Sequence, residues 1–305
     1  MSGHSPTPAA PLAAAGWRQL ALLFLLAAIW SSSFMFIKIG VATVPPVTMV
    51  ACRLVLAAII LLAYARARGH RIPSSLTAWS TFFFVGVVGN VIPFGLIAWG
   101  EIVVDSGLAA ILMGTMPVAT ALLAHAFTAD EKLTPRRAAG VVLGFSGTVL
   151  LVGVSALSGL GGETAAQLAI AGGALCYAIT TVFVRRFARL PDPVMAAGAM
   201  LAGAVVVVPW AFAVDSPLDL SPSWASMAAV AVLGVVSTGF AALLYFYLIR
   251  VVGAAVFSQV NFITPALGVA FGIVFLGETP DADAWLALAM IVSGIWLVTR
   301  ARRAA

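Results

Sequence analysis

Charge is what this sequence has least of. Only 9% of its 305 residues are charged, whereas soluble domains average about 25%, and its mean hydropathy is +1.10. So few charges cannot cover a surface in water, which excludes a soluble globular protein and leaves lipid as the solvent. Apolar runs of about 20 residues match membrane-spanning helices, and the shorter alternating segments of a membrane barrel are missing. The sequence predicts an all-α integral membrane protein.

Reactive motifs are equally scarce. The two cysteines, Cys52 and Cys176, lie in apolar runs without metal-ligand spacing and are predicted to be small core residues. The chain contains no HExxH, GxSxG or P-loop motif, and no carboxylate pair lies within an apolar run. We therefore expect no enzyme activity, no cofactor and no metal. The net charge of +5 comes from short basic groups between apolar runs, so it does not indicate nucleic-acid binding.

What the sequence does contain is ten apolar runs separated by turn signals. The Pro45-Pro46 pair supplies the turn between the first two. The predicted spans cover residues 20–40, 46–65, 78–99, 107–127, 136–154, 165–186, 194–214, 225–248, 255–276 and 283–300.

The basic residues predict how the spans are oriented. Lys and Arg accumulate on the cytoplasmic side of membrane proteins. With both termini inside, the cytoplasmic segments hold fourteen of the sixteen basic residues. We therefore expect a multi-pass protein of the inner (plasma) membrane with cytoplasmic N- and C-termini. The fourteen are Arg18, Arg66, Arg68, Arg71, Lys132, Arg136, Arg137, Arg185, Arg186, Arg189, Arg250, Arg300, Arg302 and Arg303.

The two halves of the chain repeat each other at an offset of 147 residues. Each half has five spans, an odd number, so the second half must enter the membrane inverted. Inverted repeats are frequent in secondary transporters, whose substrate lies near the midplane between the halves. The matched pairs include Trp30 with Tyr177, Ser33 with Thr180, Lys38 with Arg185, Pro46 with Pro193 and Glu131 with Glu278.

Three stretches carry a family resemblance. LAAIWSSSFMFIKIG (26–40), followed by Pro46 and Arg53, resembles the opening of EamA-type permeases of the drug/metabolite transporter superfamily. The stretch 264–298 resembles the end of that family's repeat, and 116–152 is a looser copy that lacks a Leu-Gly pair before Glu131. The resemblance implies ten transmembrane helices in two inverted five-helix repeats, and it is closest to bacterial exporters of amino acids, aromatic ones included.

Together these features predict the organisation of the chain and its function. A cytoplasmic tail (1–17) precedes the first repeat (18–155), and a second repeat (156–300) precedes a short cytoplasmic tail (301–305). We expect a secondary transporter that exports small metabolites, chiefly amino acids, by alternating access, as a monomer or weak homodimer. Other substrates, such as drug-like cations, and import remain alternatives, and a channel or an intramembrane enzyme fits the motifs less well.

Polar, aromatic and helix-breaking residues near the middle of the spans are the candidate substrate site. An unpaired polar group in hydrocarbon is costly, so each should face a partner helix or a wet cavity. For the hydroxyls, hydrogen bonding between helices is the alternative role, and Trp30 either stacks on substrate or packs in the core. Pro117 and Pro265 mark matching breaks in the two halves. The candidates are Trp30, Ser33, Asn90, Met113, Pro117, Tyr177, Thr181, Thr238, Tyr245, Gln259, Asn261 and Pro265.

Two cations and one histidine remain. Lys38 and Arg53 lie in or near apolar spans, where charges are expensive and often functional. Arg53 is a candidate partner for a substrate carboxylate, while Lys38 could instead extend to the interface. All eleven acidic residues fall in loops or at span ends, and His125 lies away from the midplane. We therefore predict facilitated diffusion rather than transport driven by a buried carboxylate, with proton antiport as the alternative.

Overall fold

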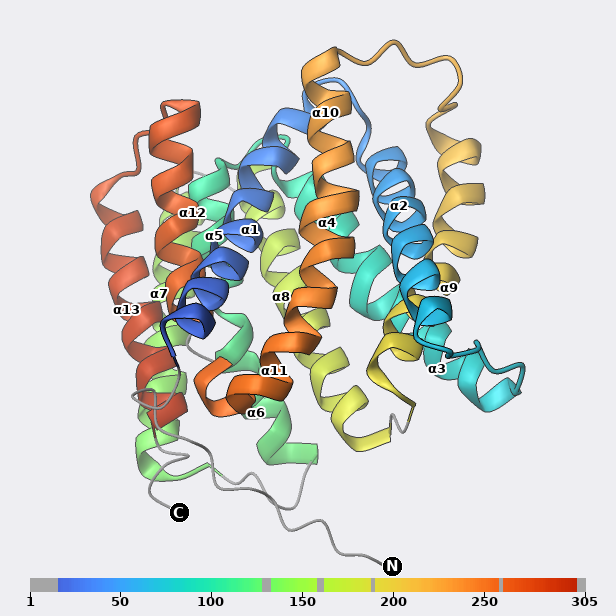
Figure 1. The fold of residues 1–305 in the computed structure, drawn as a ribbon. Helices are drawn as coiled ribbons and strands as arrows, with labels where there is room; N and C mark the ends of the chain where they lie inside the picture. The colour runs from blue at the N-terminus through green and yellow to red at the C-terminus, as the bar shows by residue number, and fades with distance from the viewer. Residues whose placement is uncertain (1–15, 128–132, 158–161, 188–189, 258–259, 301–305) are drawn as a thin grey trace, which may run out of the picture.

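The computed structural model describes residues 16–127, 133–157, 162–187, 190–257 and 260–300, and all regular structure in these ranges is helical. The helices make ten passes from one end of a bundle to the other (Figure 1). The first half comprises α1 (Trp17–Val41), α2 (Pro46–Ala67), α3 (Leu76–Gly86) with η2 (Val87–Val91) and α4 (Ile92–Gly100), α5 (Ser106–Met113) with α6 (Met116–Phe127), and α7 (Pro135–Leu157). The second comprises α8 (Gly162–Phe187), α9 (Asp192–Val214), α10 (Trp224–Val232) with η3 (Leu233–Phe240) and α11 (Ala241–Phe257), α12 (Val260–Leu276), and α13 (Ala282–Arg300).

The helices have the length and apolarity that a bilayer requires. In the described part of the chain, eight helical segments are long and apolar enough to cross a membrane, and the shorter α12 is also apolar. The predicted turn at Pro45-Pro46 is confirmed, because α2 begins at Pro46, where proline's missing N–H costs no helix hydrogen bond. The all-α membrane architecture predicted from hydropathy is confirmed.

One predicted boundary is wrong. The loop expected after residue 248 is helical, since α11 continues to Phe257 and α12 begins only at Val260. The stretch 249–257 is mostly apolar and contains no proline, so nothing in it stops the helix. Gly253 alone is a weak helix breaker.

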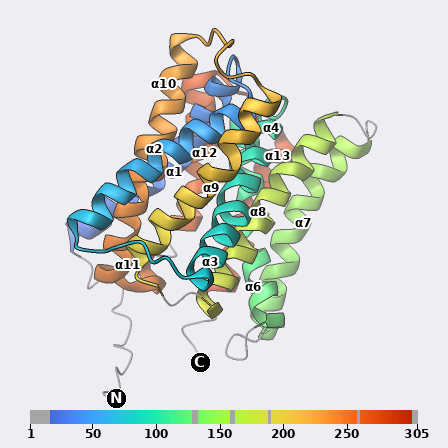
Figure 2. The same cartoon turned by 90° about the vertical axis from the view of Figure 1, so that its right-hand side faces the viewer.

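The first turn of α1 and the last turn of α13 lie at the same end of the bundle, at the bottom of Figure 1. The opposite end carries the connections 42–45, 101–105, 215–223 and 277–281, and we call it the distal end. The sequence predicts that this end faces away from the cytoplasm. Seen from the side, the helices cross the bundle with different tilts and do not form a parallel array (Figure 2).

Helices of one half pack chiefly on helices of the other. The principal pairs are α7 with α13, α2 with α9, α5 with α12, α1 with α12 and α4 with α8. The repeat relates α2 to α9, α5 to α12 and α7 to α13, so three of these pairs join equivalent helices. The two halves therefore form one interleaved bundle in which each half completes the core of the other.

Glycines allow the closest of these approaches. A Cβ added at Gly294 on α13 would lie 2.7 Å from the backbone oxygen of Gly140 and 2.7 Å from the backbone nitrogen of Gly144, both on α7. Small residues let membrane helices approach until their backbones touch, which replaces the missing hydrophobic driving force with van der Waals contact. Gly140 and Gly144 are therefore the residues at which α7 and α13 come closest to backbone contact.

We expect Gly294→Ala to lower the free energy of unfolding by about 1–3 kcal/mol, since its methyl group would strike backbone atoms that cannot rotate away. Thermal unfolding of the protein in nanodiscs measures the loss. Gly95→Ala in α4 is the matched control, because a Cβ there has no neighbour within 4 Å and alanine favours the helix. Equal stability of the two variants would contradict this packing argument.

Candidate functional site

A buried arginine lies where the two halves meet. Arg53 of α2 is only 7% exposed, and its guanidinium carbon lies 3.6 Å from the centre of the Phe94 ring. Its Nε donates a 2.7 Å hydrogen bond to Oγ1 of Thr238 on η3. Phe94 also packs edge-on against Tyr177 of α8, with ring centres 6.3 Å apart. This Arg53 group thus takes residues from both halves.

The guanidinium of Arg53 has N–H donors that make no hydrogen bond within the described part of the chain. Its described hydrogen bonds comprise only the one from Nε, which leaves the N–H groups of both terminal nitrogens without a partner in the described part of the chain. A guanidinium binds carboxylates through two parallel N–H donors. The arrangement is chemically suited to an anionic group delivered between the halves.

The helices flanking this site are locally widened in both halves. Residues 87–91 form the π-helical segment η2, and 233–240 form η3 at the equivalent place in the repeat. Asn90 Nδ2 donates to the carbonyl of Val85 at 3.0 Å, and Thr238 Oγ1 donates to Leu233 at 2.8 Å, each five residues back. These side chains satisfy carbonyls within the widened turns. Such segments occur frequently at functional sites.

A second aromatic group surrounds Trp30 on α1. Its ring centre lies 6.2 Å from that of Tyr245 and 6.1 Å from that of Phe257, both on α11. These residues belong to or pack against the apolar cluster formed by α1, α11 and α12. Tyr177 packs instead against two other apolar clusters, one that contains Val104 and one that contains Leu54 of α2. Trp30 and Tyr177, equivalent in the repeat, therefore lie in separate aromatic groups.

Of the two predicted helix breaks, only the one in the fourth pass interrupts its helix. The fourth pass is interrupted at Gly114-Thr115, between α5 and α6, while Pro265 lies within the continuous helix α12. A Cβ added at Gly114 would meet Cγ of Pro265 at 3.1 Å. The structure thus brings the irregular part of the fourth pass against the proline of the ninth, close to the contact between the halves.

The remaining candidates are placed individually. Ser33 and Thr181 donate to carbonyls four residues back in their own helices, so neither hydroxyl makes the hydrogen bond between helices that was the alternative prediction. Ser31 instead bridges the halves, donating to the carbonyl of Thr264 at 3.0 Å. Met113, Pro117 and Asn261 are half-buried, and Gln259 lies outside the described residues. His125 is exposed, and its Nδ1 accepts the backbone N–H of Leu133.

Carboxylates of the second half hold helix N-termini of the first half at the distal end. Glu278 accepts the backbone N–H groups of Ser106 and Gly107, both at 2.8 Å, at the start of α5. Asp215 accepts the backbone N–H and the hydroxyl of Thr48, at 2.9 and 2.8 Å, at the start of α2. A carboxylate there satisfies free N–H groups and the positive end of the helix dipole.

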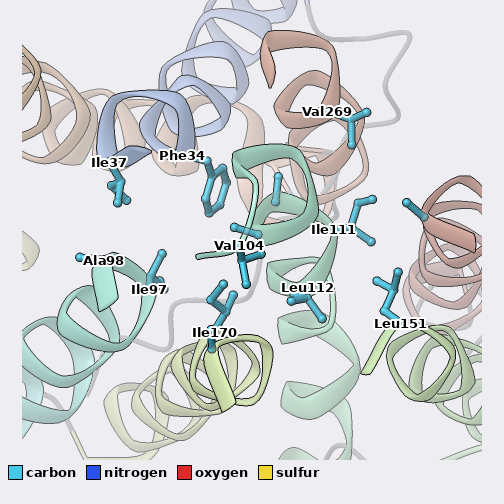
Figure 3. Close-up of a cluster of buried hydrophobic side chains, with 14 of the residues drawn as sticks. Phe34, Ile37, Ile97, Ala98, Val104, Ile111, Leu112, Leu151, Ile170 and Val269 are labelled. Atoms are coloured by element: carbon cyan, nitrogen blue, oxygen red, sulfur yellow. The ribbon is translucent and has the colours of Figure 1, made fainter. Parts of the chain in front are cut away.

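An apolar plug fills the same end. Val104, only 2% exposed, lies among side chains from α1, α4, α5, α7, α8 and α12 (Figure 3). Phe34 and Ile37 approach from α1, and Ile97 and Ile170 from the other side. We call this arrangement, in which the helix ends are tied across the halves and the plug lies between them, the closed distal end.

Lys38 does not extend to the interface. Its Nζ donates to the carbonyls of Glu101 at 2.9 Å and Val104 at 2.8 Å, so α1 is tied to the turn that follows α4. Glu101 itself is fully buried, with neither carboxylate oxygen hydrogen-bonded. The sequence placed Glu101 correctly in a loop, but its burial was missed because a loop acid normally reaches water.

A cavity of about 280 Å³ also opens at the distal end, away from the Arg53 group. Its lining includes five acidic residues, which would repel a carboxylate and do not suit it as the site of an anionic substrate. These five are Asp105, Glu163, Glu278, Asp281 and Asp283.

Comparison with known proteins finds the same duplication and assigns the chain to a class of membrane transporters. The model of the EamA-like transporter family matches twice, over residues 17–153 and 164–300. The chain belongs to this family.

Relatives match over nearly the full length. The chain is 31% identical over 279 residues to the inner membrane transporter YedA of Escherichia coli K12, covering 91% of this chain and 89% of YedA. It is 29% identical to the protein PagO of Salmonella typhimurium, covering 93% and 94% of the two chains. A solved crystal structure shares the fold with a TM-score of 0.67 and 23% identity, covering 94% of this chain and 99% of the other.

We expect Glu278→Gln to destabilise the closed distal end, because an amide NH₂ would face one of the two N–H donors and leave it unsatisfied. An unsatisfied buried donor costs about 1–3 kcal/mol. Thermal unfolding measures the effect, with Asp281→Asn as the control in the same loop, where Asp281 is exposed. An equal shift in both variants would refute a specific role for the Glu278 hydrogen bonds.

Proposed function

We propose that this transporter exports small metabolites, chiefly amino acids including aromatic ones, with the substrate carboxylate held by Arg53. The observation that carries the proposal is the buried guanidinium with free N–H donors between the halves. An amino acid supplies a carboxylate for the free N–H donors of Arg53. The side chain of the amino acid would then lie in apolar and aromatic surroundings.

The neighbouring groups support an aromatic or large apolar side chain. Phe94 and Tyr177 form aromatic surfaces next to the guanidinium, and aromatic pairs stabilise contacts beyond the area that they bury. Trp30 and Tyr245 supply a second aromatic surface on α1 and α11. Because Trp30 and Tyr177 are equivalent in the repeat, we propose that the substrate lies between the two groups and contacts each half.

The proposed cycle is alternating access by facilitated diffusion. The Arg53 group contains residues of both halves, so motion of one half against the other changes its access from one side to the other. In this scheme the closed distal end faces outside, both termini lie in the cytoplasm, and export releases substrate at the distal end. The excess of Lys and Arg at the end of the termini supports this orientation.

Arg53→Lys tests the carboxylate site. Lysine keeps the charge but cannot make two parallel hydrogen bonds. We expect substrate affinity to fall about 10- to 100-fold, corresponding to roughly 1.5–3 kcal/mol for a charged hydrogen bond. The measurement is counterflow of labelled aromatic amino acids in liposomes, compared with amines that lack the carboxylate. Arg71→Lys, in the connection after α2, is the control.

Unchanged affinity in Arg53→Lys, with normal amounts of protein in the membrane, would refute Arg53 as the carboxylate partner. Amino acids giving no counterflow in the wild-type protein, while carboxylate-free amines do, would refute the substrate class itself.

Trp30→Ala tests the second aromatic surface. We expect it to impair counterflow of aromatic amino acids more than that of alanine-sized ones, while Trp30→Phe retains most of the activity because a ring remains. Trp210→Ala is the control, since Trp210 is 48% exposed on the outer surface of α9. Unchanged kinetics in Trp30→Ala would remove Trp30 from the substrate site.

A further inference from the structure

Glu101 is a fully buried carboxyl group without a hydrogen-bond partner. It ends the third pass, in the turn that carries the apolar plug, and is 0% exposed. Its Oε1 and Oε2 both lack a partner in the described part of the chain, although its backbone carbonyl is held by Lys38. An ionised carboxylate in such a place loses its hydration without replacement, which is a large cost.

The charges around Glu101 come from every neighbouring element. Lys38 on α1 and Arg53 on α2 favour its ionised form, while Glu278 in the loop after α12 opposes it. Asp105, in the same turn, interacts with Glu278, Lys38 and Glu163 of α8. The Lys38 ammonium donates two hydrogen bonds to backbone carbonyls. It makes no hydrogen bond to the Glu101 carboxylate.

We propose that Glu101 is a proton-binding site of this transporter: its carboxyl group carries a proton while the distal end is closed and returns it to water at that end on opening. The reason is geometric. The plug and the Glu278 contacts exclude water from Glu101 only in the closed arrangement, and separation of the halves at this end would hydrate it. Glu101 takes up one proton when the distal end closes and releases one when it opens, and both protons are exchanged with water on the distal side.

The electrostatic environment agrees with this assignment. Burial is the largest cause and raises the pKa of Glu101 well above its usual range, more than Lys38 lowers it. Burial also raises the pKa of the partly exposed Asp105, which makes Asp105 the necessary control. The proposal rests on the proposed alternating access, but it can be tested without any substrate.

The sign of the pH effect follows from linkage. Below the ordinary carboxyl pKa, Glu101 is protonated in both the open and closed states, so pH has no effect. Between that value and the raised pKa of the closed state, closing binds a proton, and the open-to-closed ratio rises by up to about tenfold per pH unit. Above the raised pKa the ratio becomes constant again.

The experiment measures opening by thiol labelling in nanodiscs. An Ile37→Cys reporter on α1 in the plug, at a position only 3% exposed, is labelled with a water-soluble maleimide across a pH series, with Cys52 and Cys176 replaced by alanine. Its rate is divided by that of Ile102→Cys, a position 50% exposed in the turn that follows α4, which corrects for the reactivity of the thiol. Ile97→Cys, on α4 in the same plug, is the second reporter if Ile37→Cys does not fold.

We expect the labelling ratio to rise with pH and to become independent of pH in Glu101→Gln, whose amide imitates the protonated acid. Asp105→Asn should keep the rise. The proposal is overturned by a wild-type ratio independent of pH, by a rise that persists in Glu101→Gln, or by one lost in Asp105→Asn. A ratio set by Na⁺ concentration at fixed pH would also overturn it, in favour of a metal cation. None of these outcomes depends on which substrate is carried.

Discussion

In a bilayer, backbone N–H and C=O groups have no water to bind, and this constraint organises the whole molecule. Each pass is helical, and where a helix departs from regularity a side chain takes over. Asn90 of η2 bonds the carbonyl of Val85 near the end of α3, and Thr238 bonds that of Leu233 within η3. Glu278 and Asp215 bond the free N–H groups at the starts of α5 and α2.

The same constraint explains why the halves interleave. Without a hydrophobic force between lipid-solvated helices, close contact must come from small residues and cross-helix hydrogen bonds. Gly294 against Gly140, and Ser31 against the carbonyl of Thr264, are such contacts between the halves. Since one half completes the packing of the other, the proposed rocking motion would exchange one set of these contacts for another. The Arg53 group lies at the contact between the halves.

Much of the candidate site was visible in the sequence. Arg53 stands out as a charge in an apolar run, and Asn90 and Thr238 as polar residues at mid-span. Their partners were not predictable: Phe94 is one of eighteen phenylalanines, and only folding places its ring 3.6 Å from the guanidinium. Trp30 and Tyr177, matched by the repeat, lie in separate groups because each packs against different helices.

The sequence by itself determined the solvent, the number of passes, the turn at Pro45-Pro46 and the inverted repeat, because hydropathy, turn residues and repeat spacing are local or periodic properties. The tertiary structure alone decided which polar groups are satisfied and which are buried. Lys38 could have reached the interface but binds two carbonyls, and Glu101 lies in a loop yet is shielded from water. Burial depends on what other segments bring to a residue, and those segments can lie more than half the chain away in the sequence.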